Sequence, residues 1–466
     1  MKLSAELPSF FRGRLAWLRI AVIAFTCLLI CGVFVRTARD LATYPGIDLH
    51  CKVIPARLLV RGMDPYYDFR SQMHPDHLRT LGAATYSPAL LLLYAPLCEL
   101  HWDAQRIVYF LLDWISIFLC YIVLVRAFPR HIPRTPLWLA FVLLFIANFA
   151  FRLHLERGQY YIELALLAAL VAPGLLLNRA TWLRVLPLAL LVLLRPTYGI
   201  CIIGILCLRR FRYAAQAAAL CLLLFAATLP VAGLQDWKAY FATVRADQQE
   251  LLHAAYASAP PASVPASSQV LEGIDFSRSL TGPGVFADRT LIGVARGSVS
   301  PVLARLLDRI APNAAALNRL NTAGLALALG FDLAVFLAFS RASAPSMLPV
   351  AFLFLAPLNL ELFAPQRFAY CDLTILVPVL IILAAALAGA PRRWVLYCVI
   401  LVVGFAGPAI AFRCNLHVPL VSFLQYVGLL AILNAVCLRH AWNLRRILPS
   451  GRGCPAAASA PREIPS

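Results

Sequence analysis

The sequence predicts an all-α polytopic membrane protein with about twelve transmembrane helices and two large outer loops that contain short interfacial helices. Composition is the first reason, because 61% of the 466 residues are hydrophobic and 14% are charged, against roughly 45–50% and 25% in soluble domains. Long apolar runs also alternate with short arginine-rich breaks from residue 15 to residue 438. The formal net charge is +19, and such an excess marks cytoplasmic loops in membrane proteins. These observations exclude a soluble enzyme.

The apolar runs define the expected transmembrane helices, since a membrane span needs about 20 residues. They cover residues 15–35, 105–126, 137–152, 160–177, 183–196, 197–208, 213–232, 320–340, 346–362, 373–390, 394–412 and 418–438. The first run follows several arginines and lacks a small-residue cleavage site, so we expect a permanent anchor rather than a signal peptide. The two runs on either side of Arg195 are short, which predicts tilted or half-buried helices.

One further apolar stretch, residues 84–100, decides the topology. Pro88 and Pro96 interrupt it, and it is short for a span. If it does not cross, every short basic loop is cytoplasmic, whereas a crossing would place most of them outside, against the positive-inside rule. We therefore expect 84–100 to be re-entrant or interfacial, with both chain ends inside. The segments 36–104 and 233–319 then lie outside, and an amphipathic helix is expected near the start of the second.

Charged side chains in or beside apolar helices are costly and mark candidate functional sites. Four groups fall on the outer side: Asp48 with the segment 64–68, the turn 156–163, Arg195, and the turn 356–372. Asp64-Pro65 also fits the start of a simple turn, and the segment 156–163 also fits a polar turn around Gly158. Arg195 either binds an anion, such as a lipid phosphate or Asp113, or extends to the membrane interface.

Several kinds of chemistry lack their sequence signals. The chain has no P-loop, no GxGxxG after a strand, no GxSxG elbow and no HExxH, which excludes nucleotide-driven transport, cytosolic nucleotide-sugar chemistry and zinc hydrolysis. It has no compact Lys/Arg run, so no nucleic-acid partner is expected. Its nine histidines lack metal-ligand spacing. One disulfide is possible among the four cysteines expected on the outer side. These are Cys51, Cys98, Cys371 and Cys414.

The order of the outer elements carries a family resemblance. Asp48, after the first apolar run, is followed by PARLLVRG and by Asp64-Pro65-Tyr66. A tyrosine and proline open an apolar helix at 86–97, Gly158-Gln159 ends a later run, and Arg195-Pro196 interrupts another. A late outer loop contains APLNLELF and QRFAY. The chain thereby resembles the membrane-embedded glycosyltransferases of the C superfamily (GT-C) that use polyprenyl-phosphate sugars, and within them glycosyltransferase family 87.

The resemblance implies a GT-C-like fold and a glycosyltransferase that moves a mannose-like or pentose sugar from a polyprenyl-phosphate donor to a glycan or lipid acceptor. It would act at the outer face of a bacterial cytoplasmic membrane. Asp48 would be the general base for the acceptor hydroxyl. A cation would stabilise the leaving phosphate, with Arg195 expected first and Arg367 or Arg157 after it. The remaining residues expected at the site would bind substrate; they are Asp64, Tyr66, Tyr86, Gln159 and Glu163.

The expected organisation is a cytoplasmic N-terminus (1–14), a catalytic transmembrane module (15–232) with the first outer loop (36–104), a second outer loop (233–319), C-terminal transmembrane helices (320–438) and a cytoplasmic tail (439–466). No cofactor is expected, and a divalent metal ion is left open but not predicted, because Asp48 has no adjacent acid with which to share one. The competing hypothesis is a polytopic transporter or lipid flippase. Transporters usually show related halves and broken helices, whereas the outer loops here are unequal.

Overall fold

The computed structural model describes residues 9–43, 46–66, 86–177, 180–254, 270–271, 274–275, 309, 312–340, 347–363, 373–388, 394–406 and 418–447. The α-helices are α1 (Ser9–Thr43), α2 (Ile47–Val60), α5 (Pro88–Tyr94), α6 (Trp102–Ala127), α7 (Arg134–Phe141), α8 (Phe149–Arg157), α9 (Tyr161–Leu176), α10 (Trp182–Leu194), α11 (Gly199–Cys207), α12 (Phe211–Ala254), α15 (Ala314–Phe339), α16 (Met347–Glu361), α17 (Leu376–Leu387), α18 (Trp394–Leu401) and α20 (Val418–Ile447). Short 3₁₀ turns lie at Ala95–Leu97 and Pro196–Tyr198, and π-helical turns at Val142–Ile146 and Val402–Ala406. Two short strands, β1 (Val270–Leu271) and β2 (Ile274–Asp275), pair antiparallel.

The helices fall where the apolar runs predict them, since each predicted run contains a helix. α12 extends beyond its apolar run to Ala254, so it also includes the predicted amphipathic helix. The two parts meet at a kink at Gly233, whose backbone has φ 63° and ψ 167°. Glycine adopts a positive φ without the steric penalty of a Cβ atom, which explains the position of the kink.

Several helices are long and apolar enough to cross a membrane. Four pass by length and composition: Ala16–Ala42, Trp102–Ala127, Phe211–Arg245 and Ala315–Phe339. A fifth is possible if the bent pair Arg134–Ile146 and Ala150–Arg157, which meets at 52°, forms one broken span. Other apolar helices, including α9, α16 and α17, have 10–17 residues. The described chain is therefore a polytopic helical membrane protein, and twelve crossings stay a prediction.

The described part of the segment 84–100, which begins at residue 86, forms a short helix rather than a spanning one. α5 has 7 residues and begins with a regular cap, in which the Ser87 hydroxyl accepts a hydrogen bond from the Leu90 N–H at 3.3 Å. Pro88 occupies the first helical turn, where its missing N–H costs nothing. The helix tightens into the 3₁₀ turn Ala95–Leu97, which contains Pro96. At 1.5 Å per residue this element is shorter than the bilayer core of about 30 Å.

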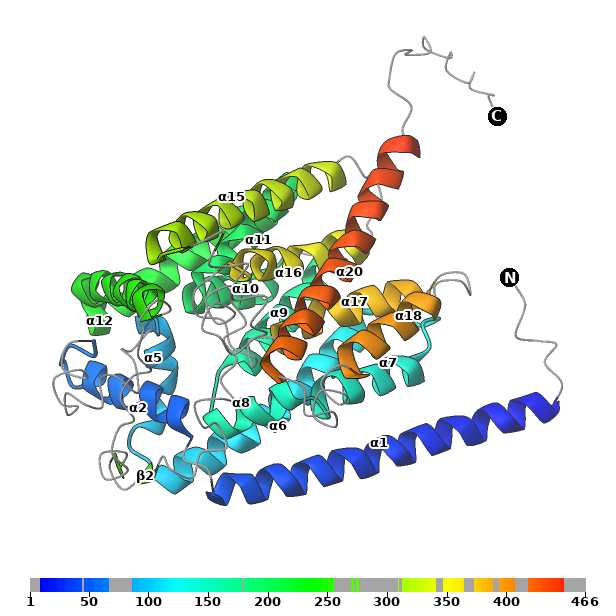
Figure 1. Cartoon of the computed structure of the whole chain (residues 1–466), viewed down its shortest axis with the longest axis horizontal. Coiled ribbons are helices and arrows are strands. Elements are labelled where there is room, and N and C mark those ends of the chain that lie inside the picture. Colours follow the sequence, from blue (N-terminus) through cyan, green and yellow to red (C-terminus); the bar gives the residue numbers. More distant parts are fainter. Residues whose placement is uncertain are drawn as a thin grey trace, which may run out of the picture.

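The centre of the helical body is built from α9, α16 and α17. α9 contacts α6, α10, α16 and α17, and nearly all side chains of α16 and α17 are buried. Figure 1 shows α1 running along one side of this body. Two contacts attach it there: the Trp138 indole N–H donates to the Thr26 hydroxyl at 2.8 Å, and Arg152 pairs with Asp40 at 2.9 Å.

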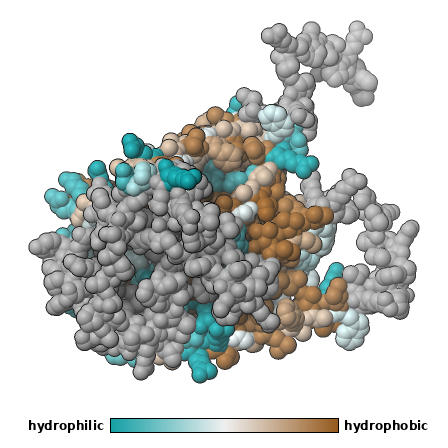
Figure 2. Space-filling view, in the orientation of Figure 1, coloured by the Kyte–Doolittle hydropathy of each residue, from teal (hydrophilic) through white to brown (hydrophobic). Residues whose placement is uncertain are grey.

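Apolar side chains also cover part of the surface. Figure 2 shows them gathered on the side where α18 and α20 lie. Exposed large hydrophobic residues on these two helices are Trp394, Val395, Val399, Leu438 and Trp442, and Val402 follows directly after α18. An apolar area of this kind faces lipid in a polytopic membrane protein.

The elements that form the candidate site meet at one end of the helical body. α2, α5 and the later part of α12 lie together there (Figure 1) and contact one another. α8 also contacts α2. This arrangement brings the polar residues that follow the first apolar run against the turn that joins α8 to α9.

Candidate functional site

Asp48 lies in the first turn of α2, which begins directly after Gly46 in the left-handed conformation. A carboxylate at a helix N-terminus is stabilised by the unpaired N–H groups and the helix dipole. Asp48 is 8% exposed and accepts hydrogen bonds from two side chains. Arg157 donates through Nε and Nη2, the latter at 2.8 Å from Oδ1, and Gln159 donates through its amide. The predicted base is therefore buried, charge-paired and fixed in orientation.

Arg157 and Gln159 reach Asp48 because α8 ends in a tight turn. Gly158 is the C-cap in the left-handed conformation, with φ 70° and ψ 52°. The carbonyl of His154 accepts the N–H groups of Gly158 and Gln159 at 2.9 and 3.2 Å, as is usual where a glycine ends a helix. Arg157 stands in the last turn of α8, where a cation is favoured by the dipole. Two helix ends of opposite polarity thus meet at one ion pair.

Lys52 is four residues after Asp48, so both side chains lie on the same face of α2. Its ammonium donates to the carbonyl oxygen of Gly158, and the side chain is fully buried. Four tyrosine rings surround the nitrogen at 5.2–5.6 Å: Tyr86, Tyr94, Tyr109 and Tyr160. Burial lowers the pKa of Lys52 to about 8, and the charge of Asp48 opposes this shift. Cation–π contacts of this kind stabilise an ammonium away from water.

Tyrosines extend this cluster in two directions. The Tyr109 hydroxyl donates to the carbonyl of Gln159. The Tyr109 hydroxyl oxygen in turn accepts a hydrogen bond from the Tyr94 hydroxyl at 3.0 Å. On the other side, the Tyr66 hydroxyl donates to the carbonyl of Tyr86 at 2.7 Å. The rings of Tyr86 and Tyr160 meet edge to face at 5.7 Å. The first outer segment, α5 and the α8–α9 turn are therefore joined through polar tyrosine contacts.

Arg195 lies beside the same turn and has a carboxylate partner. Pro196 disfavours a helical conformation at the residue before it, and Arg195 accordingly ends α10 with φ −140° and ψ 94°. Its Nε donates to Glu361 Oε1 at 2.8 Å, while Nη1 is 3.3 Å from the Tyr160 hydroxyl and 3.4 Å from that of Tyr161. Glu361, rather than Asp113, is the acid that compensates the arginine. The arginine side chain is 21% exposed.

The structure joins most of the site residues predicted from the sequence. Asp48 contacts Arg157 and Gln159 directly, and Tyr160, next in the chain, contacts Arg195. Tyr86 and Tyr66 belong to the adjoining tyrosine cluster. Asp64 accepts the Tyr66 N–H at 2.8 Å, which is the turn-initiating contact of an Asp-Pro pair. Arg367 lies outside the described residues.

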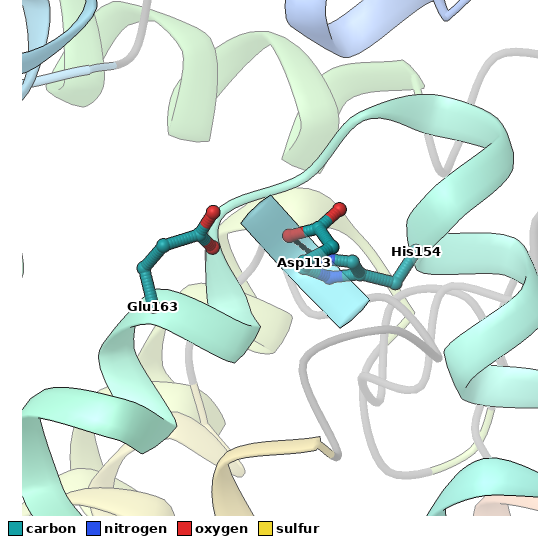
Figure 3. A group of neighbouring side chains, drawn as sticks. All are labelled: Asp113, His154 and Glu163. Atoms are coloured by element: carbon teal, nitrogen blue, oxygen red, sulfur yellow. Dashed lines mark hydrogen bonds and ion pairs between the residues drawn. The ribbon is translucent and has the colours of Figure 1, made fainter. Parts of the chain in front are cut away.

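Glu163 is near Lys52 and Tyr94 but makes none of the hydrogen bonds described for Asp48. Figure 3 shows its carboxyl group facing Asp113 of α6 and His154 of α8, so it belongs to a second polar group behind the α8–α9 turn. Within the described ranges, Asp113, His154 and Glu163 are the residues whose side-chain atoms are close enough together to hold a metal ion. Lys52 and Glu361 also belong to the site but were not among the predicted site residues.

The cysteines are thiols in the part of the chain that the structure describes. Cys51 and Cys98 are both buried and free, and the Cys98 thiol lies 3.4 Å from the carbonyl of Val53. Burial raises the pKa of the Cys51 thiol to about 12, so it is unreactive at neutral pH. Cys371 and Cys414, which the sequence left open as disulfide partners, lie outside the described residues.

Gly158→Ala should destabilise the protein more than Gly62→Ala does. Both glycines have positive φ, at 70° and 71°, so each alanine carries the same backbone cost of about 1–2 kcal/mol. A Cβ at Gly158 would also lie 2.5 Å from the Cβ of Leu49, whereas nothing lies within 4 Å of one at Gly62. Overpacking adds about 1–3 kcal/mol. The thermal midpoints of the two purified variants test this, and equal midpoints would show that the α2 contact does not constrain the turn.

Comparison with known proteins gives one match. The family model of glycosyltransferase family 87 matches residues 84–340. This range contains α5, the α8–α9 turn, Arg195 and the long helix α12. No curated protein and no solved structure matches the chain.

Proposed function

We propose, from the premise that this chain belongs to glycosyltransferase family 87, that it transfers a mannose-like or pentose sugar from a polyprenyl-phosphate donor to a glycan or lipid acceptor. Family membership makes the chain a membrane glycosyltransferase, which sets aside the transporter and flippase alternative. The proposed location is the outer face of a bacterial cytoplasmic membrane, with the residues around Asp48 facing outward.

The observation that carries the proposal is the orientation of Asp48. A carboxylate has about four lone-pair positions, and three are directed at Arg157 Nε, Arg157 Nη2 and Gln159 Nε2. One position is left for the hydroxyl of an acceptor. Such a fixed carboxylate can accept a proton as the new bond forms, a contribution of about 10²–10⁴-fold to the rate.

The reaction that fits this geometry is direct displacement at the anomeric carbon. The acceptor oxygen forms a bond to that carbon while its proton passes to Asp48. The bond between the anomeric carbon and the phosphate oxygen breaks, and its electron pair leaves with the polyprenyl phosphate. Arg195 is the proposed partner of that phosphate, because its guanidinium offers several N–H donors and lies beside Tyr160, next to Gln159. Positive charge placed in advance stabilises the charge that develops on the leaving group.

The other predicted residues take more distant parts in this proposal. Arg157 holds Asp48, so we assign it to positioning the base rather than to first contact with the donor phosphate. Tyr86, Tyr66 and Asp64 shape the wall formed by the first outer segment and α5, against which the sugar or acceptor would lie. Transfer at Asp48 needs no metal ion in this scheme, because the cations are supplied by arginines.

Release of free polyprenyl phosphate tests the proposed function. Membranes that contain the protein are supplied with polyprenyl-phosphate mannose or with a polyprenyl-phosphate pentose, and the lipid products are separated. We expect one donor to yield free lipid phosphate together with a labelled acceptor, in proportion to the amount of protein. No release from either donor above membranes that lack the protein would overturn the proposal. Movement of intact donor between leaflets without release would indicate the flippase alternative.

A further inference from the structure

A second polar group lies behind the α8–α9 turn, apart from the contacts of Asp48. It consists of Asp113 from α6, His154 from α8 and Glu163 from α9. His154 Nε2 is 3.3 Å from Asp113 Oδ1, and one potential ligand atom from each residue lies within 4.8 Å of the others. Figure 3 shows the Glu163 carboxyl group directed toward the other two side chains. Three separate helices therefore supply groups to one point.

The polar atoms of this group are buried and incompletely paired. Asp113 and His154 have no exposed surface. In the part of the chain that the structure describes, Asp113 Oδ2, His154 Nδ1 and Glu163 Oε2 are buried without a hydrogen-bond partner. Two neighbouring carboxyl groups cannot both stay ionised in a buried site without compensation. The ammonium of Lys52 is near enough to act on both carboxyl groups through its charge, and Asp113 and Glu163 are within hydrogen-bonding reach of each other. The remaining requirement is a group that takes up the lone pairs still unpaired on these side chains.

A divalent metal ion meets this requirement better than a shared proton does. A proton between the two carboxyl groups would satisfy one acceptor and would not engage the imidazole, whereas an ion can take a lone pair from all three side chains. An ion with ligands at about 2.0–2.2 Å would bind an oxygen from each carboxylate and one imidazole nitrogen, and the three side chains would close around it from their present separations of up to 4.8 Å. Two carboxylates and one imidazole also balance a charge of +2, and they suit Zn²⁺ or Mn²⁺.

We propose that Asp113, His154 and Glu163 bind one divalent transition-metal ion of the Zn²⁺ or Mn²⁺ class, which ties α6, α8 and α9 together. The proposed ion is structural and takes no part in the displacement at Asp48. It reaches that site through the backbone, because the carbonyl of His154 accepts the N–H groups of Gly158 and Gln159. The ion therefore fixes the turn that presents Arg157 and Gln159 to Asp48. The sequence left a divalent metal ion open without predicting one, and gave no ligands for it.

The first test needs only the unaltered protein. The full chain, purified with a tag that contains no histidine, is treated with a chelator, returned to metal-free buffer and titrated with Mn²⁺ or Zn²⁺ alone. After titration we expect about one bound ion per chain by mass spectrometry of the metal content. The thermal midpoint of the chelated protein should rise as the ion is restored. Absence of both a retained ion and a metal-dependent midpoint would overturn the proposal in favour of a shared proton.

Variants locate the ion. Asp113→Asn and Glu163→Gln should weaken metal binding at least about tenfold, with thermal midpoints that no longer respond to the ion. Asp332→Asn is the matched control, because Asp332 is a fully buried acid of α15 whose carboxylate accepts a hydrogen bond from Asn359 at 2.7 Å. It should bind the ion like the unaltered protein. Wild-type affinity in Glu163→Gln and Asp113→Asn would place the ion elsewhere. Binding and stability are read without sugar transfer, so this result is independent of the proposed function.

Discussion

Replacing Asp48 by asparagine is expected to abolish sugar transfer while the protein still inserts and folds. The change keeps the shape of the side chain but removes its ability to accept the proton of the acceptor hydroxyl. The loss should be about 10²–10⁴-fold in the rate. The amide is neutral and keeps one acceptor oxygen, so it cannot reproduce the two-oxygen, charge-paired contact that the Arg157 guanidinium makes with Asp48. Initial rates of polyprenyl-phosphate release by the purified, reconstituted enzyme measure the effect.

Asp40→Asn is the control for this prediction. Asp40 also pairs with an arginine of α8, since Arg152 Nε lies 2.9 Å from its carboxylate, but it belongs to α1 and has no assigned role in the reaction. We expect Asp40→Asn to retain most of the transfer rate. Turnover retained in Asp48→Asn would remove Asp48 from the mechanism. Comparable losses in both variants would mean that any broken Asp–Arg pair on α8 disables the enzyme through its structure.

The helices of this fold could be predicted from the sequence because their signal is local. An apolar run bounded by arginines indicates a membrane helix wherever it packs, and each such run contains a helix here. Pro88 and Pro96 likewise indicated that the segment 84–100 holds only a short helix, and its re-entrant or interfacial position stays a prediction. Asp48 and Gly158-Gln159 could be proposed as site residues for a similar reason, since each follows an apolar run.

The pairing within the site could not be predicted in the same way. Asp48 and Arg157 are 109 residues apart, and Arg195 and Glu361 are 166 apart, so only tertiary packing brings them together. Lys52 had a local signal, its spacing of four residues from Asp48, but a lysine in an outer loop is usually solvated. His154 showed no metal-ligand spacing because its neighbours come from two other helices. Sequence patterns identify ligands on one element and miss sites that several elements share.

Arg195→Gln is expected to lower kcat/KM for the lipid-linked donor by about 10²–10³-fold, the usual effect of removing a group that stabilises charge in the transition state. Glutamine can still donate to Glu361 Oε1, which also accepts from the Thr197 hydroxyl at 3.0 Å, so the local packing is largely kept. Arg195→Lys should retain part of the activity, because it keeps the charge but not the planar arrangement of donors. Donor kinetics of the three purified proteins, measured at a saturating acceptor concentration, give the comparison.

Glu361→Gln separates a phosphate-binding role of Arg195 from a structural one. The Glu361 side chain is 2% exposed, against 21% for Arg195, so the acid is the buried anchor and the arginine is the member that a donor can reach. If Arg195 only neutralises Glu361, removal of the acid makes the arginine the unpaired charge, and Glu361→Gln should damage folding as much as Arg195→Gln does. If Arg195 also binds the donor phosphate, Glu361→Gln leaves that cation in place, still in contact with Tyr160 and Tyr161. The KM of the Glu361→Gln variant for the donor should then rise far less than the KM of the Arg195→Gln variant. Equal donor kinetics in wild type, Arg195→Gln and Arg195→Lys would assign the arginine to packing alone.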